Sequence, residues 1–97
     1  MLDITGVFAV SDYYALDFMQ FLKGKGVRIP QDLQIIGMDD SMASRESIPA
    51  LTTIHQDADL RARTAIKCIE NMRDGKNCDT RIVLPVKLIK RESTKEL

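Results

Sequence analysis

The sequence is poor in the residues from which metal centres and secreted folds are built. It has no tryptophan, one histidine, His55, and two cysteines, Cys68 and Cys78, which do not form a C-x-x-C pair. These residues at this spacing do not supply the ligands of a zinc site. We expect both cysteines to be free thiols in a reducing compartment, a disulfide between them being the lesser alternative.

An excess of charge of one sign and long apolar runs are absent as well. The 97 residues include 14 basic and 14 acidic ones, so the formal charge is zero and no field attracts a phosphate backbone. No apolar run approaches the ~20 residues of a membrane span. The opening segment MLDITGVFAV lacks the pattern of a secretory signal. We expect one soluble domain that contacts neither a membrane nor nucleic acid by itself.

The apolar pattern of the first half predicts a strand, a helix and a second strand. Apolar runs at 6–10 and 33–38 are typical of strands, the first one covered on both faces. Between them, apolar residues recur at helical spacing over about 12–23. Residues 39–50 are expected to be irregular or weakly helical, and the β-branched stretch 51–55 predicts a short strand.

The second half predicts a long helix and a terminal strand. The helix covers about 57–72, and its apolar face consists of Ala58, Ala62, Ala65, Ile66, Ile69 and Met72. Residues 81–91 alternate with period two around Pro85, which predicts an edge or bent strand. The order of elements predicts an α/β fold, a partial parallel sheet flanked by helices. With so few strands, the sheet is expected to keep an uncovered face or edge.

The stretch IIGMDD places two carboxylates, Asp39 and Asp40, directly after the second strand. The carboxyl ends of parallel strands face the crevice where ligands bind, so the pair is either a binding site or a solvated turn. A magnesium-dependent enzyme using both carboxylates is a further alternative. A triad of His55 with Ser11 and Asp39 is disfavoured, because no G-x-S-x-G elbow is present and no residue is expected to orient the imidazole.

Five motifs in order resemble those of one protein family. They are SD..AL at 11–16, G..IP.D at 26–32, IIGMDD at 35–40, P.LTTI.Q at 49–56 and R.ST at 91–94. Together they resemble the carboxy-terminal portion of bacterial transcriptional regulators of the lactose-repressor and galactose-repressor (LacI/GalR) family. The resemblance implies part of one lobe of a periplasmic-binding-protein-like (type I) fold. It also implies that the helix-turn-helix headpiece, which would contact the DNA, and the first lobe lie outside these 97 residues.

The resemblance implies roles for individual residues. Asp39 matches the aspartate that accepts hydrogen bonds from effector hydroxyls, typically of a sugar. Ser11 stands at a position where an asparagine usually reaches the effector, and a hydroxyl can make fewer contacts than an amide. Asp12 is a signature residue expected mainly to cap a helix, with effector contact as the alternative. Asp40 is expected to be structural, and neither cofactor nor metal is implied.

The resemblance also implies a homodimer and a regulatory function. The dimer face maps to Ala15, Leu16, Phe18, Met19, Arg45, Ser47 and Ile48, although a helix packed in a core would show the same apolar pattern. The implied protein is a cytoplasmic, non-enzymatic regulator that binds a small, sugar-like effector. A periplasmic-type sugar-binding protein with the same fold is the other binding-protein alternative.

Overall fold

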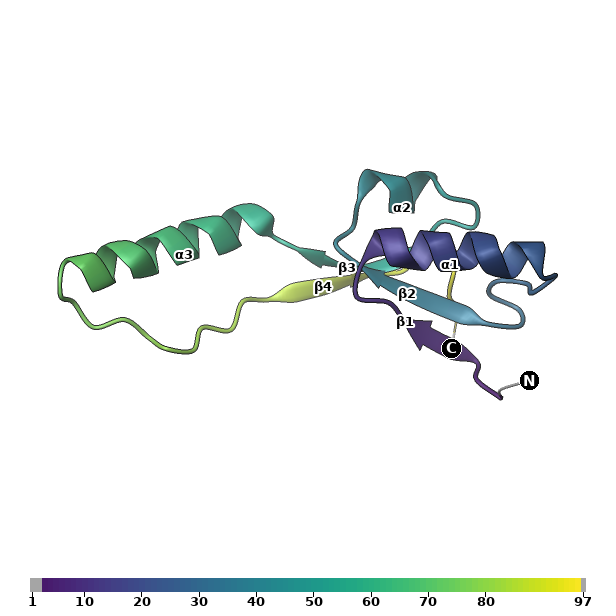
Figure 1. The fold of residues 1–97 in the computed structure, drawn as a ribbon, viewed down its shortest axis with the longest axis horizontal. Helices are drawn as coiled ribbons and strands as arrows, with labels where there is room; N and C mark the ends of the chain where they lie inside the picture. Colours follow the sequence, from purple (N-terminus) through teal and green to yellow (C-terminus); the bar gives the residue numbers. More distant parts are fainter. Residues whose placement is uncertain (1–2, 97) are drawn as a thin grey trace. The chain divides into compact units, whose positions relative to one another are not determined.

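The computed structural model describes residues 3–96 as an α/β fold (Figure 1). Its strands are β1 (Gly6–Phe8), β2 (Gln34–Met38), β3 (Thr52–Gln56) and β4 (Val86–Ile89), and its helices are α1 (Asp12–Gly24), α2 (Met42–Glu46) and α3 (Ala58–Arg73). The expected order of elements is confirmed. The segment expected to be irregular or weakly helical contains the five-residue helix α2.

The chain divides into two compact units. One, here called the sheet unit, contains the residues up to His55 and those from Lys87 onward. The other, the α3 unit, is Gln56–Val86. The sheet unit holds α1, α2 and most of the sheet, whereas the α3 unit holds α3 and the connection that follows it.

The four strands lie in the order β1-β2-β3-β4. The first three are parallel, with Val7 opposite Ile35 and Gly37 opposite Thr53. The last strand lies beside β3 and runs in the opposite direction (Figure 1), so the sheet is mixed rather than wholly parallel. The terminal strand begins at Val86, later than expected, because Pro85 has no N–H to donate to a strand ladder.

The core of the sheet unit lies between α1 and the sheet. Ala15 and Met19 of α1 are buried against Leu33, Ile35 and Leu51. Burial of an aliphatic side chain of this size stabilises a fold by about 1.5–3 kcal/mol. These few contacts hold α1 on β2. The other face of β1 is open, since Phe8 is exposed, and the expectation that the first strand is covered on both faces is wrong for this chain.

A close approach between α1 and β2 requires glycine at position 37. A Cβ atom there would come within 2.4 Å of an Asp12 Oδ1 and 2.8 Å of a Leu51 methyl group. Both distances are far below van der Waals contact, so any larger residue would push α1 away from the sheet. Gly37 therefore allows the start of α1 to reach the carboxyl end of β2.

The carboxy-terminal segment is tied to the sheet by buried hydrogen bonds. The Ser93 hydroxyl donates to the carbonyl of Ile35 at 2.6 Å and accepts from the amide of Thr52 at 2.8 Å. The Ser93 carbonyl accepts from the amide of Ile35 at 3.1 Å, and the hydroxyls of Thr52 and Thr94 lie 2.8 Å apart. The serine and threonine of the R.ST motif thus join the end of the chain to β2 and β3.

The α3 unit has a well-formed helix but almost no core. Asp57 caps α3 by accepting a hydrogen bond from the amide of Leu60, and no residue of the helix is buried. Ile66, Ile69 and Met72 are 56%, 65% and 69% exposed. The helix was predicted correctly, but burial of its apolar face was not found.

Candidate functional site

Asp39 and Ser11 both follow the carboxyl ends of parallel strands. Asp39 comes directly after β2 and is exposed, and its amide donates to the carbonyl of Ile54 on β3 at 2.9 Å. Ser11 follows β1 as the N-cap of α1, where its hydroxyl accepts from the amide of Tyr13 at 3.1 Å. Because β1 and β2 are parallel neighbours, both residues lie at the same edge of the sheet.

The backbone at this edge is strained. Asp39 and Asp40 have φ angles of 118° and 53°, in a region that residues other than glycine rarely occupy. Each such conformation costs on the order of 1–3 kcal/mol and persists only where the surroundings impose it; such residues cluster at ligand sites and switches. Here the conformation is imposed by the hydrogen bond from the Asp39 amide to β3 and by the contacts of the Asp40 side chain.

Asp40 is the centre of an ionic cluster. Its carboxylate accepts hydrogen bonds from Arg91 and from Arg45, the latter at 3.5 Å, and lies 3.0 Å from Nδ1 of His55. Its side chain is only 8% exposed. Arg91 also donates to the hydroxyl of Ser44 and to the carbonyl of Leu51, both at 2.9 Å. These contacts agree with the expected structural role of Asp40.

The electrostatics of the cluster favour the ionised form of Asp40. Burial by itself would raise the pKa of this carboxyl, but hydrogen bonds from Arg91, Arg45 and His55 outweigh it and hold the pKa below its usual value. Asp40 is therefore an anion matched by cationic and hydrogen-bonding partners.

The ionic cluster involves residues of both enzyme alternatives, the magnesium site at Asp39 and Asp40 and the triad that includes His55. Two arginines on Asp40 occupy the oxygens that a magnesium ion would need. Within residues 3–96 no three carboxylate, cysteine or histidine side chains gather as a metal site. The imidazole of His55, which was not expected to have an orienting partner, is oriented by Asp40 and not by the residues of the disfavoured triad.

Asp12 is buried and bonded inside the sheet unit. It has no exposed surface, and its two carboxylate oxygens accept from the amide of Ser41 at 2.7 Å and the hydroxyl of Thr53 at 2.6 Å. Ser11, not Asp12, caps α1. The expectation that Asp12 caps the helix is therefore wrong, because its carboxylate instead joins α1 to the β2–α2 connection and to β3.

A groove between α1 and the end of α2 gathers several of the expected dimer-face residues. It has a volume of about 380 Å³ and is lined by Leu16, Met19, Gln20, Lys23, Glu46, Ser47 and Ile48. Ile48 is 82% exposed, and its carbonyl accepts from the ammonium group of Lys23 at 2.9 Å. Arg45 is also exposed.

Not all of the expected dimer-face residues are accessible. Ala15 is fully buried and Met19 is 4% exposed, because both pack on the sheet, and Leu16 and Phe18 are half-buried beside them. The exposed aromatic residues of α1 are Tyr13, Tyr14 and Phe21. The apolar stripe read as a dimer face is thus partly the core face of α1, the alternative that the sequence left open.

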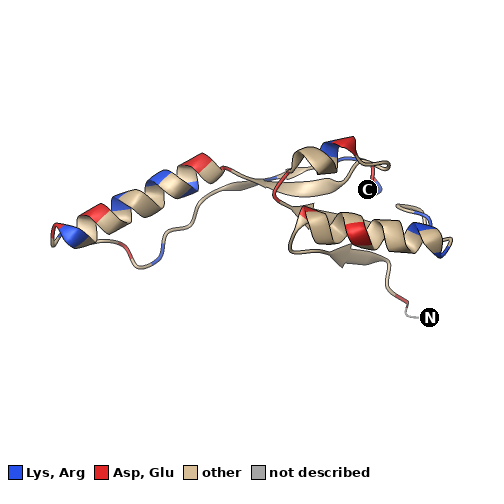
Figure 2. Ribbon diagram, turned by 45° about the horizontal axis from the view of Figure 1, so that its top comes forward, with Lys and Arg blue, Asp and Glu red and all other residues tan. Residues whose placement is uncertain are grey.

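Charges of both signs are interspersed on the helices. Figure 2 shows both red and blue segments along α3, where the basic residues Arg61, Arg63 and Lys67 lie between the acidic residues Asp59 and Glu70. The presence of both signs on α3 agrees with the neutral composition of the chain. Within the described residues, no helix combines the length and the apolar character that crossing a bilayer requires.

The sequence reasoning missed Arg91. The R.ST motif was used for the resemblance, yet no role was assigned to its arginine, because 51 positions separate Arg91 from Asp40. Its guanidinium is largely buried, with 15% of the side chain exposed. The only indication in the sequence was that Arg91 belongs to the same short motif as Ser93 and Thr94.

Comparison with known proteins identifies the family. Residues 2–94 match the model of the periplasmic binding protein-like domain. The chain is 39% identical to the HTH-type transcriptional repressor PurR of Haemophilus influenzae over 97 residues, which cover 96% of this chain and 29% of that repressor.

Solved structures of relatives have the same fold. The Lac repressor dimer bound to operator and the anti-inducer ONPF superposes with a TM-score of 0.84 and 33% identity, covering 93% of this chain and 32% of that one. A periplasmic binding protein/LacI transcriptional regulator from Alkaliphilus metalliredigens, complexed with D-xylulofuranose, superposes with a TM-score of 0.80 and 38% identity, covering 95% and 35%.

The chain spans less than a third of the length of the curated relatives it matches, 29% in the case of the repressor above. The match nevertheless extends over nearly all of this chain and includes both the strand ends and the carboxy-terminal R.ST segment. The chain belongs to the periplasmic binding protein-like domain family, and it is similar to the corresponding part of LacI-family transcriptional regulators.

Proposed function

We propose that the chain is the carboxy-terminal part of the effector-binding domain of a ligand-responsive transcriptional regulator, with Asp39 as an effector contact. The observation that carries the proposal is the exposed Asp39 carboxylate at the carboxyl edge of β2, on backbone held at φ 118°. A carboxylate can accept hydrogen bonds from two neighbouring hydroxyls, as a sugar presents them. The relative from Alkaliphilus metalliredigens was solved with a sugar.

Ser11 is the second proposed contact. It shares the sheet edge with Asp39, is half-buried, and its hydroxyl can still donate while it accepts from Tyr13. Asp12 is left out of the proposed effector contacts, because its buried carboxylate is already bonded to Ser41 and Thr53.

Two surfaces support the proposal that the chain is part of a longer domain. The apolar side chains of α3 are uncovered, and so is the sheet face around Phe8. A stable domain covers apolar area of this kind. We propose that the preceding part of the regulator covers both surfaces and carries the DNA-binding headpiece.

The proposed regulator is a cytoplasmic homodimer without enzymatic activity. The Lac repressor relative was solved as a dimer bound to operator. We place the dimer contact along the groove between α1 and α2, with Leu16, Ser47 and Ile48 at its rim, rather than on the buried Ala15. Effector binding would change operator affinity only by favouring one arrangement of the dimer over the other.

Effector titration of the intact regulator tests the role of Asp39. A panel of pentoses and hexoses is screened by calorimetry, and the best ligand is titrated into the wild type, Asp39→Ala and the control Asp59→Ala. Loss of two hydrogen bonds to a carboxylate is expected to weaken binding by about 10²-fold or more in Asp39→Ala. The control alters an exposed ion pair on α3 and should bind as the wild type does. Equal affinity of Asp39→Ala and wild type would contradict the proposal.

A further inference from the structure

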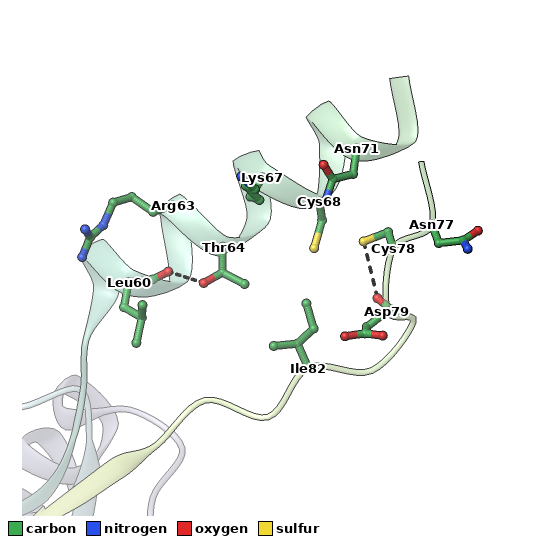
Figure 3. Close-up of a pocket in the computed structure, with 10 residues that line it drawn as sticks. All are labelled: Leu60, Arg63, Thr64, Lys67, Cys68, Asn71, Asn77, Cys78, Asp79 and Ile82. Carbon is green, nitrogen blue, oxygen red and sulfur yellow. Dashed lines mark hydrogen bonds between the residues drawn. The ribbon is translucent and has the colours of Figure 1, made fainter. Parts of the chain in front are cut away.

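The two cysteines of the α3 unit face each other across an open pocket. The pocket has a volume of about 440 Å³ and is lined by both cysteines together with residues of α3 and of the connection that follows it. Figure 3 shows the sulfur atoms of Cys68, on α3, and Cys78, on the connection, pointing toward one another. Both are free thiols and half-buried, so a small oxidant can reach them.

The end of α3 brings the two thiols together. Gly75 has a φ of 71°, a conformation that reverses the chain after a helix. The amide of Gly75 donates to the carbonyl of Met72 at 3.2 Å, and the amide of Lys76 to that of Asn71 at 2.8 Å. These bonds fold the connection back along the last turns of α3, and Cys78 comes to lie beside Cys68.

We propose that Cys68 and Cys78 form a reversible intramolecular disulfide when the protein meets a hydroperoxide. The Cys68 thiolate attacks one oxygen of hydrogen peroxide, the O–O bond breaks, and a sulfenic acid and one water form. Cys78 then gives up its thiol proton and its sulfur attacks the sulfenic sulfur, so that an S–S bond forms, the S–O bond breaks, and the hydroxyl leaves with a proton as a second water. The two thiols lose two electrons and two protons in all, and the peroxide is reduced to two waters. A dithiol restores both thiols by exchange.

The surroundings of Cys78 disfavour its thiolate form. The adjacent Cys68 side chain, together with burial and the negative charge of Asp79, raises the pKa of the Cys78 thiol. The thiol also makes a weak hydrogen bond of 3.6 Å to the carbonyl of Asp79. A raised pKa makes Cys78 a slower first nucleophile, because the thiolate is the form that attacks the peroxide. The disulfide would tie the connection to α3 without altering the residues of the sheet unit.

Peroxide treatment of the purified intact regulator tests the proposal directly. Each polypeptide is expected to lose the thiols of Cys68 and Cys78 and the mass of two hydrogen atoms, and to migrate as a monomer on a non-reducing denaturing gel. It should yield a tryptic peptide pair linked through Cys68 and Cys78, and it should regain both thiols with dithiothreitol. In Cys78→Ser, oxidation should stop at a sulfenic acid that dimedone traps on Cys68. Disulfide-linked dimers of the wild type, or sulfinic acid on either cysteine without a link, would overturn the proposal.

Disulfides between residues this close in sequence can also form in an unfolded chain, and a second measurement separates the two cases. The effective concentration of the two thiols, measured against glutathione, is expected to be at least about tenfold higher in buffer than in concentrated urea. The matched control is Cys68→Ser combined with Glu70→Cys, which keeps a similar loop but moves the thiol to another face of α3. The control should show no such difference. Equal values for the wild type in buffer and in urea would refute preorganisation of the pair.

Discussion

The sheet unit and the α3 unit have helices of similar local quality but very different surroundings. Ser11 caps α1 and Asp57 caps α3, and each helix has an acidic residue in its first turn and a basic residue in its last. The first helix buries Ala15 and Met19 against the sheet, whereas the second buries no residue. Local signals are therefore enough to predict a helix, but burial depends on elements that these signals do not specify.

The polar contacts of the two units differ in the same way. Asp40 and Arg91 are largely buried, and their partners lie on several segments of the sheet unit. Arg63 and Asp59 form an ion pair within one helix, with 68% and 82% of their side chains exposed. Exposed pairs contribute about 0–1 kcal/mol, and removal of one partner from a buried pair costs far more.

A matched pair of isoleucine substitutions gives the largest expected contrast between the units. Ile35→Ala should lower the free energy of unfolding by about 4 kcal/mol, because Ile35 is fully buried between α1 and the sheet. In these 97 residues by themselves, Ile69→Ala should change it by less than about 0.5 kcal/mol, since Ile69 is 65% exposed there. Urea denaturation followed by circular dichroism measures both. Similar losses for the two variants would show that α3 is packed as firmly as α1.

Two arginine substitutions sharpen the polar side of the comparison. Arg91→Ala should cost about 3 kcal/mol, because it removes the most buried cationic partner of the Asp40 carboxylate and the guanidinium that donates to the Leu51 carbonyl. Arg63→Ala removes only an exposed pair and should cost less than about 1 kcal/mol. The same urea titrations measure the difference, and an Arg91→Ala variant as stable as Arg63→Ala would mean that the Asp40 cluster is not an important source of stability.

The smallest expected effect is a pH dependence of the sheet unit. The pKa of Asp40 is lower in the folded protein than its ordinary value. Its contribution to stability is therefore complete above the unfolded-state pKa, about 4, and is lost as the pH falls through the folded-state pKa. The difference in unfolding free energy between wild type and Asp40→Asn should accordingly shrink as the pH falls below about 4. A difference that stays constant from pH 7 to pH 3 would exclude Asp40 as the titrating group.

The sequence predicted the positions of Asp39 and Ser11, the two residues of the candidate site that follow the ends of strands. Placing Asp39 and Ser11 at one edge of the sheet required only a parallel sheet and the positions at which two apolar runs stop. The Asp40 cluster could not be predicted, since Arg91 reaches it from the far end of the chain. The burial of Asp12 was equally hidden, because its partners Ser41 and Thr53 become neighbours only when the sheet has formed.

The sequence alone determined the order and type of the elements, the family, and the positions of the residues that leave the strands. Periodicity, capping residues and short motifs are local, so the amino-acid pattern contains them directly. The tertiary structure decided which apolar residues of α1 are buried, that α3 has no covered face, and that Asp40 is enclosed by Arg91, Arg45 and His55. These properties arise from contacts between distant segments, and only the assembled sheet brings those segments together.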